Sequence, residues 1–198
     1  FLGGTARELL SRLANLRRLV LVGNAENAFA KAAALPDGLE HLALRQLAMV
    51  PGALAAALAN ARLATLELDR CAFSSRGQLR ELAAQSRLDE LRVLEPAELP
   101  EEGLDLRELP LALTRLAIEG GPVEPATMLA LAKCTALREL SLRRSRLVGD
   151  ALAPLTKLRD LVHLDLAECS GIDEGAALDL VECAPLRRLS LAGTDLRK

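Results

Sequence analysis

The chain has 198 residues, of which 51% are hydrophobic and only 2% aromatic, and its formal net charge is −2. Because 25 basic and 27 acidic side chains nearly balance, we expect neither a general nucleic-acid binder nor a membrane-surface binder. The only aromatic residues, Phe1, Phe29 and Phe73, offer no platform on which single-stranded nucleic acid could stack. No apolar run approaches the roughly 20 residues that span a membrane, so the predicted partners include neither nucleic acid nor membrane.

A six-residue pattern, LxxLx(L/V/I), recurs along the chain at steps of 23 to 25 residues. Its eight copies begin at Leu16, Leu39, Leu63, Leu88, Leu113, Leu137, Leu161 and Leu186. A regular period of this length is typical of solenoids, in which each unit packs on its neighbours. The spacing therefore predicts one repeat domain over residues 1–198, with strand motifs at 16–24, 39–47, 63–71, 88–96, 113–121, 137–145, 161–169 and 186–194.

Each motif predicts a short strand followed by a turn. In the run that starts at Leu137, alternation along a strand would bury Leu140 and Leu142 and would turn Glu139 and Ser141 outward. Parallel strands of successive repeats would then form a sheet on the concave face. The chain would return across the convex face in short helices or irregular crossings, which makes the expected fold class α/β.

The first strand carries valines where most other repeats have charged or small outward residues. Val20 and Val22 occupy these outward positions, and exposed apolar residues of this kind often mark a contact surface. The chain begins with Phe1 and stops at Lys198 directly after the last strand. We therefore expect a segment of a longer protein, with adjacent domains at both ends and with a domain or another chain covering Val20 and Val22.

Helix-start signals lie between several strands. Capping boxes are predicted at Thr5-x-x-Glu8 and Ser75-x-x-Gln78, and N-caps at Asp150 and Asp173. The alanine-rich run after Gly52 is a strong helix former. By contrast, residues 95–110 contain three prolines and six acidic residues, Asp105 among them. This composition predicts an irregular acidic crossing, interpreted as a solvated convex edge or, alternatively, as a docking surface for a basic partner.

The outward positions predict columns of side chains that cross the sheet from strand to strand. Opposite charges in these columns predict ion pairs within four groups: Glu90, Arg115 and Glu139; Glu67 and Arg92; Arg45 and Asp69; Glu119 and Arg143. In the last strands, small residues lie among arginines, which would leave room for a partner's side chains. The candidate partner-binding residues are Arg138, Ser141, Arg143, His163, Asp165, Arg188 and Ser190. The alternative is a solvated face without a partner.

No pattern indicates catalysis, a cofactor or a metal site. The two histidines, His41 and His163, would lie five repeats apart, or about 24 Å at the usual strand spacing. The sequence contains no nucleophile elbow and no complete phosphate-binding loop. Cys71, Cys134, Cys169 and Cys183 lack metal-ligand spacing, and we expect buried thiols in a reducing compartment. The predicted location is the cytoplasm or, for a secreted effector, the interior of a host cell.

The repeated motif is identified as the leucine-rich repeat, and it covers nearly the whole chain, which implies a horseshoe-shaped solenoid. The runs that begin at Gly52, Gly149 and Gly175 resemble GALA-type repeats. The run 161–175, with Cys169, is similar to the cysteine-containing repeats of F-box proteins. Both groups imply recognition of a protein target. A preference for Arg over Lys and the rarity of Ile further suggest a GC-rich bacterial genome.

Three functions follow as hypotheses. The first is a protein–protein interaction scaffold that binds a protein partner and is not an enzyme. The second is the substrate-recognition part of an F-box or ubiquitin-ligase-type bacterial effector, and the third is the sensing end of a multidomain immune-type receptor. A self-associating array is a further alternative.

Overall fold

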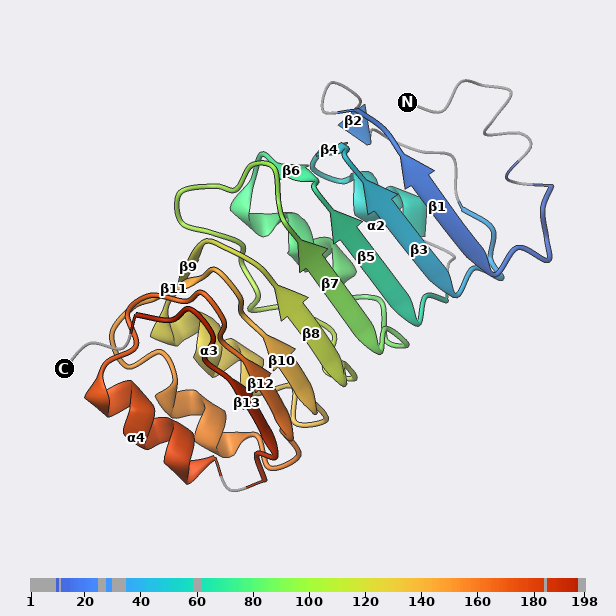
Figure 1. The fold of residues 1–198 in the computed structure, drawn as a ribbon. Helices are drawn as coiled ribbons and strands as arrows, with labels where there is room; N and C mark the ends of the chain where they lie inside the picture. Colours follow the sequence, from blue (N-terminus) through green and yellow to red (C-terminus); the bar gives the residue numbers. More distant parts are fainter. Residues whose placement is uncertain are drawn as a thin grey trace.

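The computed structural model describes residue 10 and residues 12–24, 28–29, 35–58, 62–183 and 185–195. Its main element is one parallel sheet whose strands follow each other in chain order (Figure 1). The eight strands are β1 (Arg18–Val22), β3 (His41–Arg45), β5 (Thr65–Asp69), β7 (Glu90–Leu94), β8 (Arg115–Ile118), β10 (Glu139–Ser141), β12 (His163–Asp165) and β13 (Arg188–Ser190). The predicted solenoid with a parallel sheet is confirmed.

The register of the sheet places equivalent residues of successive repeats side by side. Leu140 of β10, for example, lies opposite Leu116 of β8 and Leu164 of β12. These three leucines are at most 3% exposed. From β3 to β12, alternation along each strand buries every second residue and turns the intervening residues outward, so the outward columns expected from the sequence lie in register across the sheet.

Two smaller parallel sheets follow the turns after the main strands. One contains β2 (Ala28–Phe29), β4 (Ala48–Met49) and β6 (Ala72–Phe73), and the other contains β9 (Pro122–Val123) and β11 (Arg146–Leu147). In β4, β6, β9 and β11 the apolar residue that lies two positions beyond the start of the turn is buried, and Leu196 stands at the same place in the last repeat. Met49, Phe73, Val123 and Leu147 are all buried, whereas Leu196 lies outside the described residues.

The return segments contain short helices on one side of the main sheet, and the other side stays open (Figure 1). The helices are α2 (Ala53–Leu58), η1 (Arg76–Leu82), α3 (Pro125–Leu131), η2 (Ala153–Lys157) and α4 (Glu174–Glu182).

The helix-start predictions have different outcomes. The capping box of Ser75 and Gln78 opens η1, and the Asp173 carboxylate caps α4 by accepting the Ala176 N–H. The prediction for Asp150 is wrong, since η2 starts later and its N-cap is Leu152. Thr5 and Glu8 lie outside the described residues.

The acidic segment is irregular, as predicted, but it is not wholly solvated. Residues 95–110, all of which the structure describes, form no helix, and their one bridge joins Glu98 to Ala72. Asp105 is only 2% exposed. Its carboxylate forms ion pairs with Arg80 and Arg107. The expectation of a solvated acidic edge is therefore wrong at Asp105, because two arginines make its burial tolerable.

Candidate functional site

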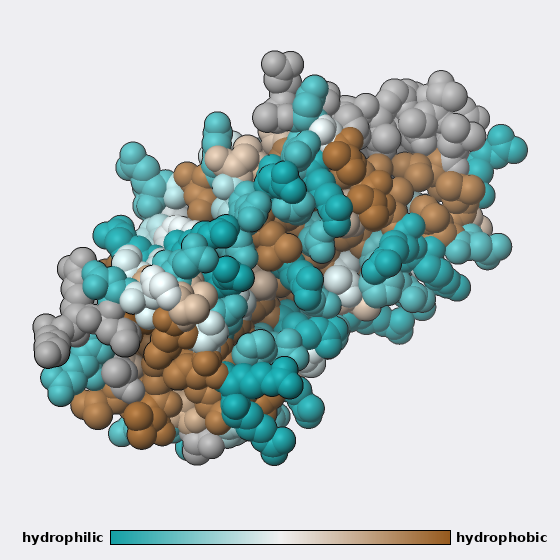
Figure 2. Space-filling view, viewed as in Figure 1, coloured by the Kyte–Doolittle hydropathy of each residue, from teal (hydrophilic) through white to brown (hydrophobic). Residues whose placement is uncertain are grey.

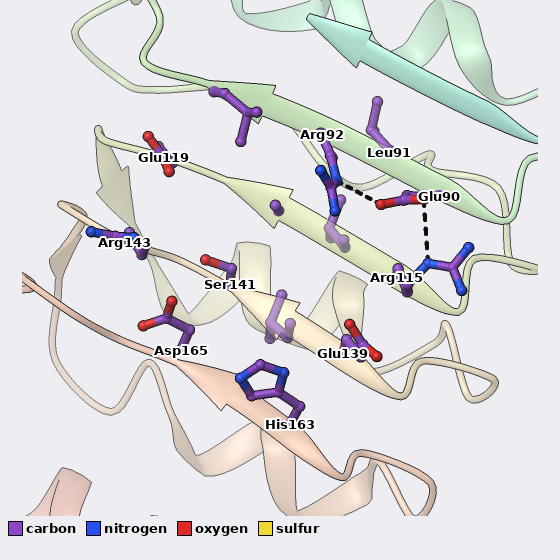
Figure 3. Close-up of a pocket in the computed structure, with 14 residues that line it drawn as sticks. Glu90, Leu91, Arg92, Arg115, Glu119, Glu139, Ser141, Arg143, His163 and Asp165 are labelled. Atoms are coloured by element: carbon purple, nitrogen blue, oxygen red, sulfur yellow. Dashed lines mark hydrogen bonds and ion pairs between the residues drawn. The ribbon is translucent and has the colours of Figure 1, made fainter. Parts of the chain in front are cut away.

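A hollow of about 240 Å³ opens on the sheet face that the helices leave free. It crosses β7, β8, β10 and β12, and its walls are charged (Figure 3). The lining residues are Glu90, Leu91, Arg92, Leu94, Arg115, Leu116, Ala117, Glu119, Glu139, Leu140, Ser141, Arg143, His163 and Asp165. We call it the sheet hollow.

The depth of the sheet hollow comes from small residues in the middle of an outward column. Ala117 on β8 and Ser141 on β10 are direct neighbours. They lie between Arg92 on β7 and Asp165 on β12, which continue the same column. In this column Arg92 is large, Ala117 and Ser141 are small, and Asp165 is of medium size. The column therefore leaves space above the two small side chains. The strands hold this floor in place, so the site sits on a rigid part of the fold.

One end of the sheet hollow is closed by a compact ion network. The Glu90 carboxylate accepts a hydrogen bond from Arg92 Nε at 2.5 Å and pairs with Arg115 Nε at 3.3 Å. Arg115 also reaches Asp89 at 2.7 Å. Two arginines thus meet two carboxylates, and this end is electrically balanced. Figure 3 shows the bonds of Glu90 to Arg92 and Arg115.

Several predicted ion pairs have other partners. Arg92 bonds Glu90 on its own strand, whereas Glu67 pairs with Arg45 at 2.9 Å. Arg45 also lies 3.8 Å from Asp69, as predicted. The predicted columns correctly place these residues close together. Long side chains, however, can reach a diagonal neighbour as well as the residue directly opposite. The pairing of Glu67 with Arg92 is therefore wrong.

The other end of the sheet hollow meets the turns that follow the strands. At these turns the chain repeatedly adopts a left-handed conformation, which non-glycine residues rarely do. Gln46, Arg70, Glu95, Arg144 and Glu168 have φ between 43° and 60°, and Gly120 and Gly193 occupy the same position in their repeats. The recurring turn aligns charged side chains from different repeats along one edge. The sequence predicts a turn after each strand but does not mark this position within it.

These aligned charges form a second ion network. Arg143 pairs with Glu168 at 2.9 Å, and Arg144 reaches Glu168, Glu95 and Glu119 at 3.2, 3.4 and 3.6 Å. Hydrogen bonds from the two arginines lower the pKa of Glu168, and the same bonds raise the pKa of Arg143 and of Arg144. The predicted pair of Glu119 with Arg143 is wrong, because each residue bonds to another partner.

Between the two networks lie polar groups without a charged partner. Within the described part of the chain, the side chains of Glu139, Ser141 and His163 form neither a hydrogen bond nor an ion pair. Asp165 accepts the Ala167 N–H at 3.0 Å and has no ion pair there. Figure 3 shows the His163 ring between Glu139 and Asp165. This part of the sheet hollow is therefore free to bond a ligand.

The structure brings together only some of the predicted site residues. Ser141, Arg143, His163 and Asp165 line the sheet hollow. Arg138, directly before β10, and Arg188 and Ser190, on β13, do not line it, although β13 pairs with β12. Ala167, two residues beyond Asp165, would face outward if the alternation continued, but it is buried.

Sequence reasoning missed the contribution of β7 and β8 to the site. The predicted columns include Glu90, Arg92, Arg115 and Glu119. The predicted binding site nevertheless lies on the last strands, because small residues are more numerous there. The available signal was the pair Ala117 and Ser141, which marks a gap between larger neighbours.

The valines of β1 face outward, as the alternation predicts. Val20 and Val22 are 48% and 55% exposed. In Figure 2, apolar residues gather toward the ends of the molecule, whereas hydrophilic residues predominate over the middle strands. At the other end, Leu178 and Val181 of α4 and Leu189 of β13 are also exposed.

The cysteines are buried free thiols. Burial raises the pKa of Cys71 to about 11, and it also raises the pKa of Cys134, Cys169 and Cys183. The described residues contain no group of three or more His, Cys, Asp or Glu side chains arranged to hold a metal. Of the helices that the structure describes, none has the length and hydrophobicity to cross a bilayer.

Comparison with protein-family models and with curated proteins finds no match, whereas solved structures show the same fold. The mouse RP105/MD-1 complex matches with a TM-score of 0.50 and 19% identity, over 91% of this chain and 36% of that one. A leucine-rich repeat protein of Leptospira interrogans matches with a TM-score of 0.51 and 16% identity, over 100% of this chain and 59% of that one. The chain thus spans 36% and 59% of the lengths of these two neighbours.

Proposed function

We propose that this leucine-rich repeat chain is a protein-interaction scaffold that binds a partner on its open sheet face, with the sheet hollow at the centre of the contact. The sheet hollow carries the proposal, since it combines a rigid floor with polar groups that have no partner among the described residues. The mouse structure of the same fold is itself a complex, of RP105 with MD-1.

The size of the sheet hollow supports a protein partner over a metabolite. Its volume of about 240 Å³ lies below the roughly 300–1,000 Å³ of typical small-molecule sites. It suits one or two side chains that project from a larger surface. The surrounding strands would then provide the wider contact that a protein interface needs.

A catalytic role is disfavoured although Ser141, His163 and Asp165 share the sheet hollow. A hydrolytic triad needs a histidine that bonds both the nucleophile and the acid. Here Ser141 lies beside Asp165, and His163 lies beside Glu139. In the described chain no hydrogen bond joins any two of the three side chains. We therefore assign them to binding.

The exposed apolar residues at the two ends of the sheet support further protein contacts, with adjacent domains or with another chain. Val20 and Val22 would contribute at β1, and Leu189 at β13. Narrower roles stay predictions: target recognition in an F-box or ubiquitin-ligase-type bacterial effector, and sensing in an immune-type receptor. So do the likeness to GALA-type repeats and a location in the cytoplasm or, after secretion, in a host cell.

The test is affinity purification from the source cell with three baits: the wild-type chain, Ser141→Trp and Thr135→Trp. Ser141→Trp fills the sheet hollow, whereas Thr135 is exposed on a turn before β10 and controls for an added indole. Each captured protein is then purified, and its Kd for the three baits is measured. Binding that only Ser141→Trp weakens supports the proposal. Equal binding to all three baits would move the contact away from the sheet hollow.

A further inference from the structure

We infer that the partner inserts a basic side chain, lysine or arginine, into the sheet hollow between Glu139 and Asp165. This inference rests on the proposed function and names the chemistry of the partner at that site. It departs from the sequence-based hypothesis, which stressed the arginines of the last strands.

Acidic side chains outnumber basic ones over part of the sheet hollow. At the β7 end, Arg92 and Arg115 are matched by Asp89 and Glu90. Over the rest of the sheet hollow and its edge, Arg143 and Arg144 face five carboxylates, those of Glu95, Glu119, Glu139, Asp165 and Glu168.

Arg143 and Arg144 are already engaged by carboxylates. Arg143 donates to Glu168, and Arg144 bonds Glu168 and also approaches Glu119. The pKa of Arg143 is raised first by the Glu168 hydrogen bond and next by the field of Asp165. The buried Nε of Arg143 has no hydrogen-bond partner among the described residues, but an anionic ligand would still have to compete with Glu168 for this guanidinium. A cation would instead meet Glu139 and Asp165, neither of which forms an ion pair in the described chain.

Glu139 and Asp165 stand on neighbouring strands, because Glu139 lies opposite His163 and Asp165 lies opposite Ser141. Their Cα atoms are therefore diagonal neighbours, about 8 Å apart at normal strand spacing and rise, and the His163 ring lies between them (Figure 3). A guanidinium or ammonium placed over this ring can donate to both carboxylates, and charge-assisted bonds of this kind are the stronger class of hydrogen bond. The Ser141 hydroxyl lies on the same floor and offers a further acceptor.

Three other arginines lie near these carboxylates. Arg115 is opposite Glu139 on β8, where it is bonded to Asp89 and Glu90. Arg138 precedes β10, and Arg188 lies opposite His163 on β13. In the part of the chain that the structure describes, neither forms an ion pair with Glu139 or Asp165. Both arginines are exposed to solvent. The two carboxylates are thus available to a partner.

The test uses the full chain and three synthetic peptides of equal length, each a glycine–serine sequence with arginine, lysine or glutamate at its centre. Binding is followed by NMR of the ¹⁵N-labelled protein at low and high salt. We expect the arginine and lysine peptides to shift the amide signals of Ser141 and His163, and salt to weaken this effect. The glutamate peptide should leave these signals in place. Equal shifts with all three peptides, or none with the basic ones, would overturn the inference.

A matched pair of double variants assigns the effect to the two carboxylates. Glu139→Gln with Asp165→Asn removes two charges but keeps the acceptor for the Ala167 N–H. Glu174→Gln with Glu182→Gln makes the same change in charge on α4, away from the sheet face. We expect the first pair to weaken binding of the basic peptides about tenfold and the second pair to leave it unchanged. Equal weakening by both pairs would reduce the effect to net charge and refute the site.

The protein captured by affinity purification separates this inference from the proposed function. A partner that Ser141→Trp displaces, but that binds the Glu139→Gln, Asp165→Asn variant as tightly as wild type, would refute the basic side chain and leave the scaffold function standing. A partner that both variants weaken supports both. Captured partners that all ignore Ser141→Trp would refute the proposed function itself.

Discussion

Asp105 shows how one residue fixes an irregular segment. Its buried carboxylate bonds Arg80 and Arg107 and also accepts the Arg107 backbone N–H at 3.0 Å, while its own N–H donates to the Arg76 carbonyl. The acidic crossing is thereby tied to η1. We predict that Asp105→Asn lowers the free energy of unfolding by about 1–3 kcal/mol, measured by urea denaturation at pH 7. Glu102→Gln, at an exposed neighbouring site, should change it little.

The same residue predicts a dependence on pH. Hydrogen bonds from Arg107, with those from Arg80, hold the pKa of Asp105 far below its usual range. Since the folded pKa is depressed, the stabilisation is present above the unfolded value of about 3.9 and is lost as the pH falls toward the folded value. The difference between wild type and Asp105→Asn should therefore shrink from pH 7 to pH 3. A constant difference would show that the charge of Asp105 does not contribute.

Cys71 illustrates a turn residue whose chemistry is suppressed by packing. Its thiol is fully buried and donates to the Leu44 carbonyl at 3.3 Å, and burial raises its pKa to about 11. Because the thiolate is the reactive form, we predict that Cys71 reacts with a disulfide reagent at pH 8 only when the chain opens. The rate should rise steeply with added urea and reach that of a free thiol after unfolding. Immediate labelling of the folded chain would contradict its burial.

At the scale of elements, neighbouring repeats complete each other's helices. The Glu81 side chain of η1 accepts the Gly52 N–H at 2.6 Å and the Ala55 N–H at 3.1 Å, so it caps the start of α2 from the next repeat. A carboxylate there also suits the positive end of the helix.

We predict that Glu81→Ala speeds hydrogen exchange at Gly52 and Ala55, because loss of a cap costs about 1 kcal/mol locally. Exchange in the middle strands should not change. Glu182→Ala in α4 is the control, since this glutamate is exposed at the end of its helix. Exchange that accelerates over the whole chain would mean that the contact supports the entire solenoid.

The elements differ in how far the sequence predicts them. The strands and their register follow from two periods, an alternation of two and a repeat of about 24 residues, and both are visible in the sequence. The pair of Asp105 with Arg80 and the Glu81 cap join residues 25 to 29 positions apart, and their formation depends on how the return segments pack. The sequence predicts part of the lining of the sheet hollow, because the alternation places Ser141 and His163 in outward columns. The bonds that engage Arg143 depend on side-chain reach, which the pattern does not encode.

At the scale of the whole molecule, stability should depend on position along the stack. A solenoid has little contact between distant repeats, so each unit is held by its immediate neighbours. Leu140 and Leu189 occupy the same place in their repeats, but Leu140 is 2% exposed and Leu189 is 43% exposed. The difference arises because β10 has a neighbour on both sides, while β13 pairs only with β12 in the described chain.

We predict that Leu140→Ala lowers the free energy of unfolding by about 2–5 kcal/mol, the usual cost of a cavity in a packed core. Leu189→Ala should cost under about 1 kcal/mol, since its side chain is already partly in water. Urea denaturation followed by circular dichroism measures both, and hydrogen exchange locates the loss. Exchange in Leu140→Ala should accelerate first in β8, β10 and β12, the strands in direct contact with the cavity, and only later in β3 and β5. Equal losses for the two variants would mean that β13 is covered in solution, by a second copy or by further chain, and mass measured over a range of concentrations would distinguish these two.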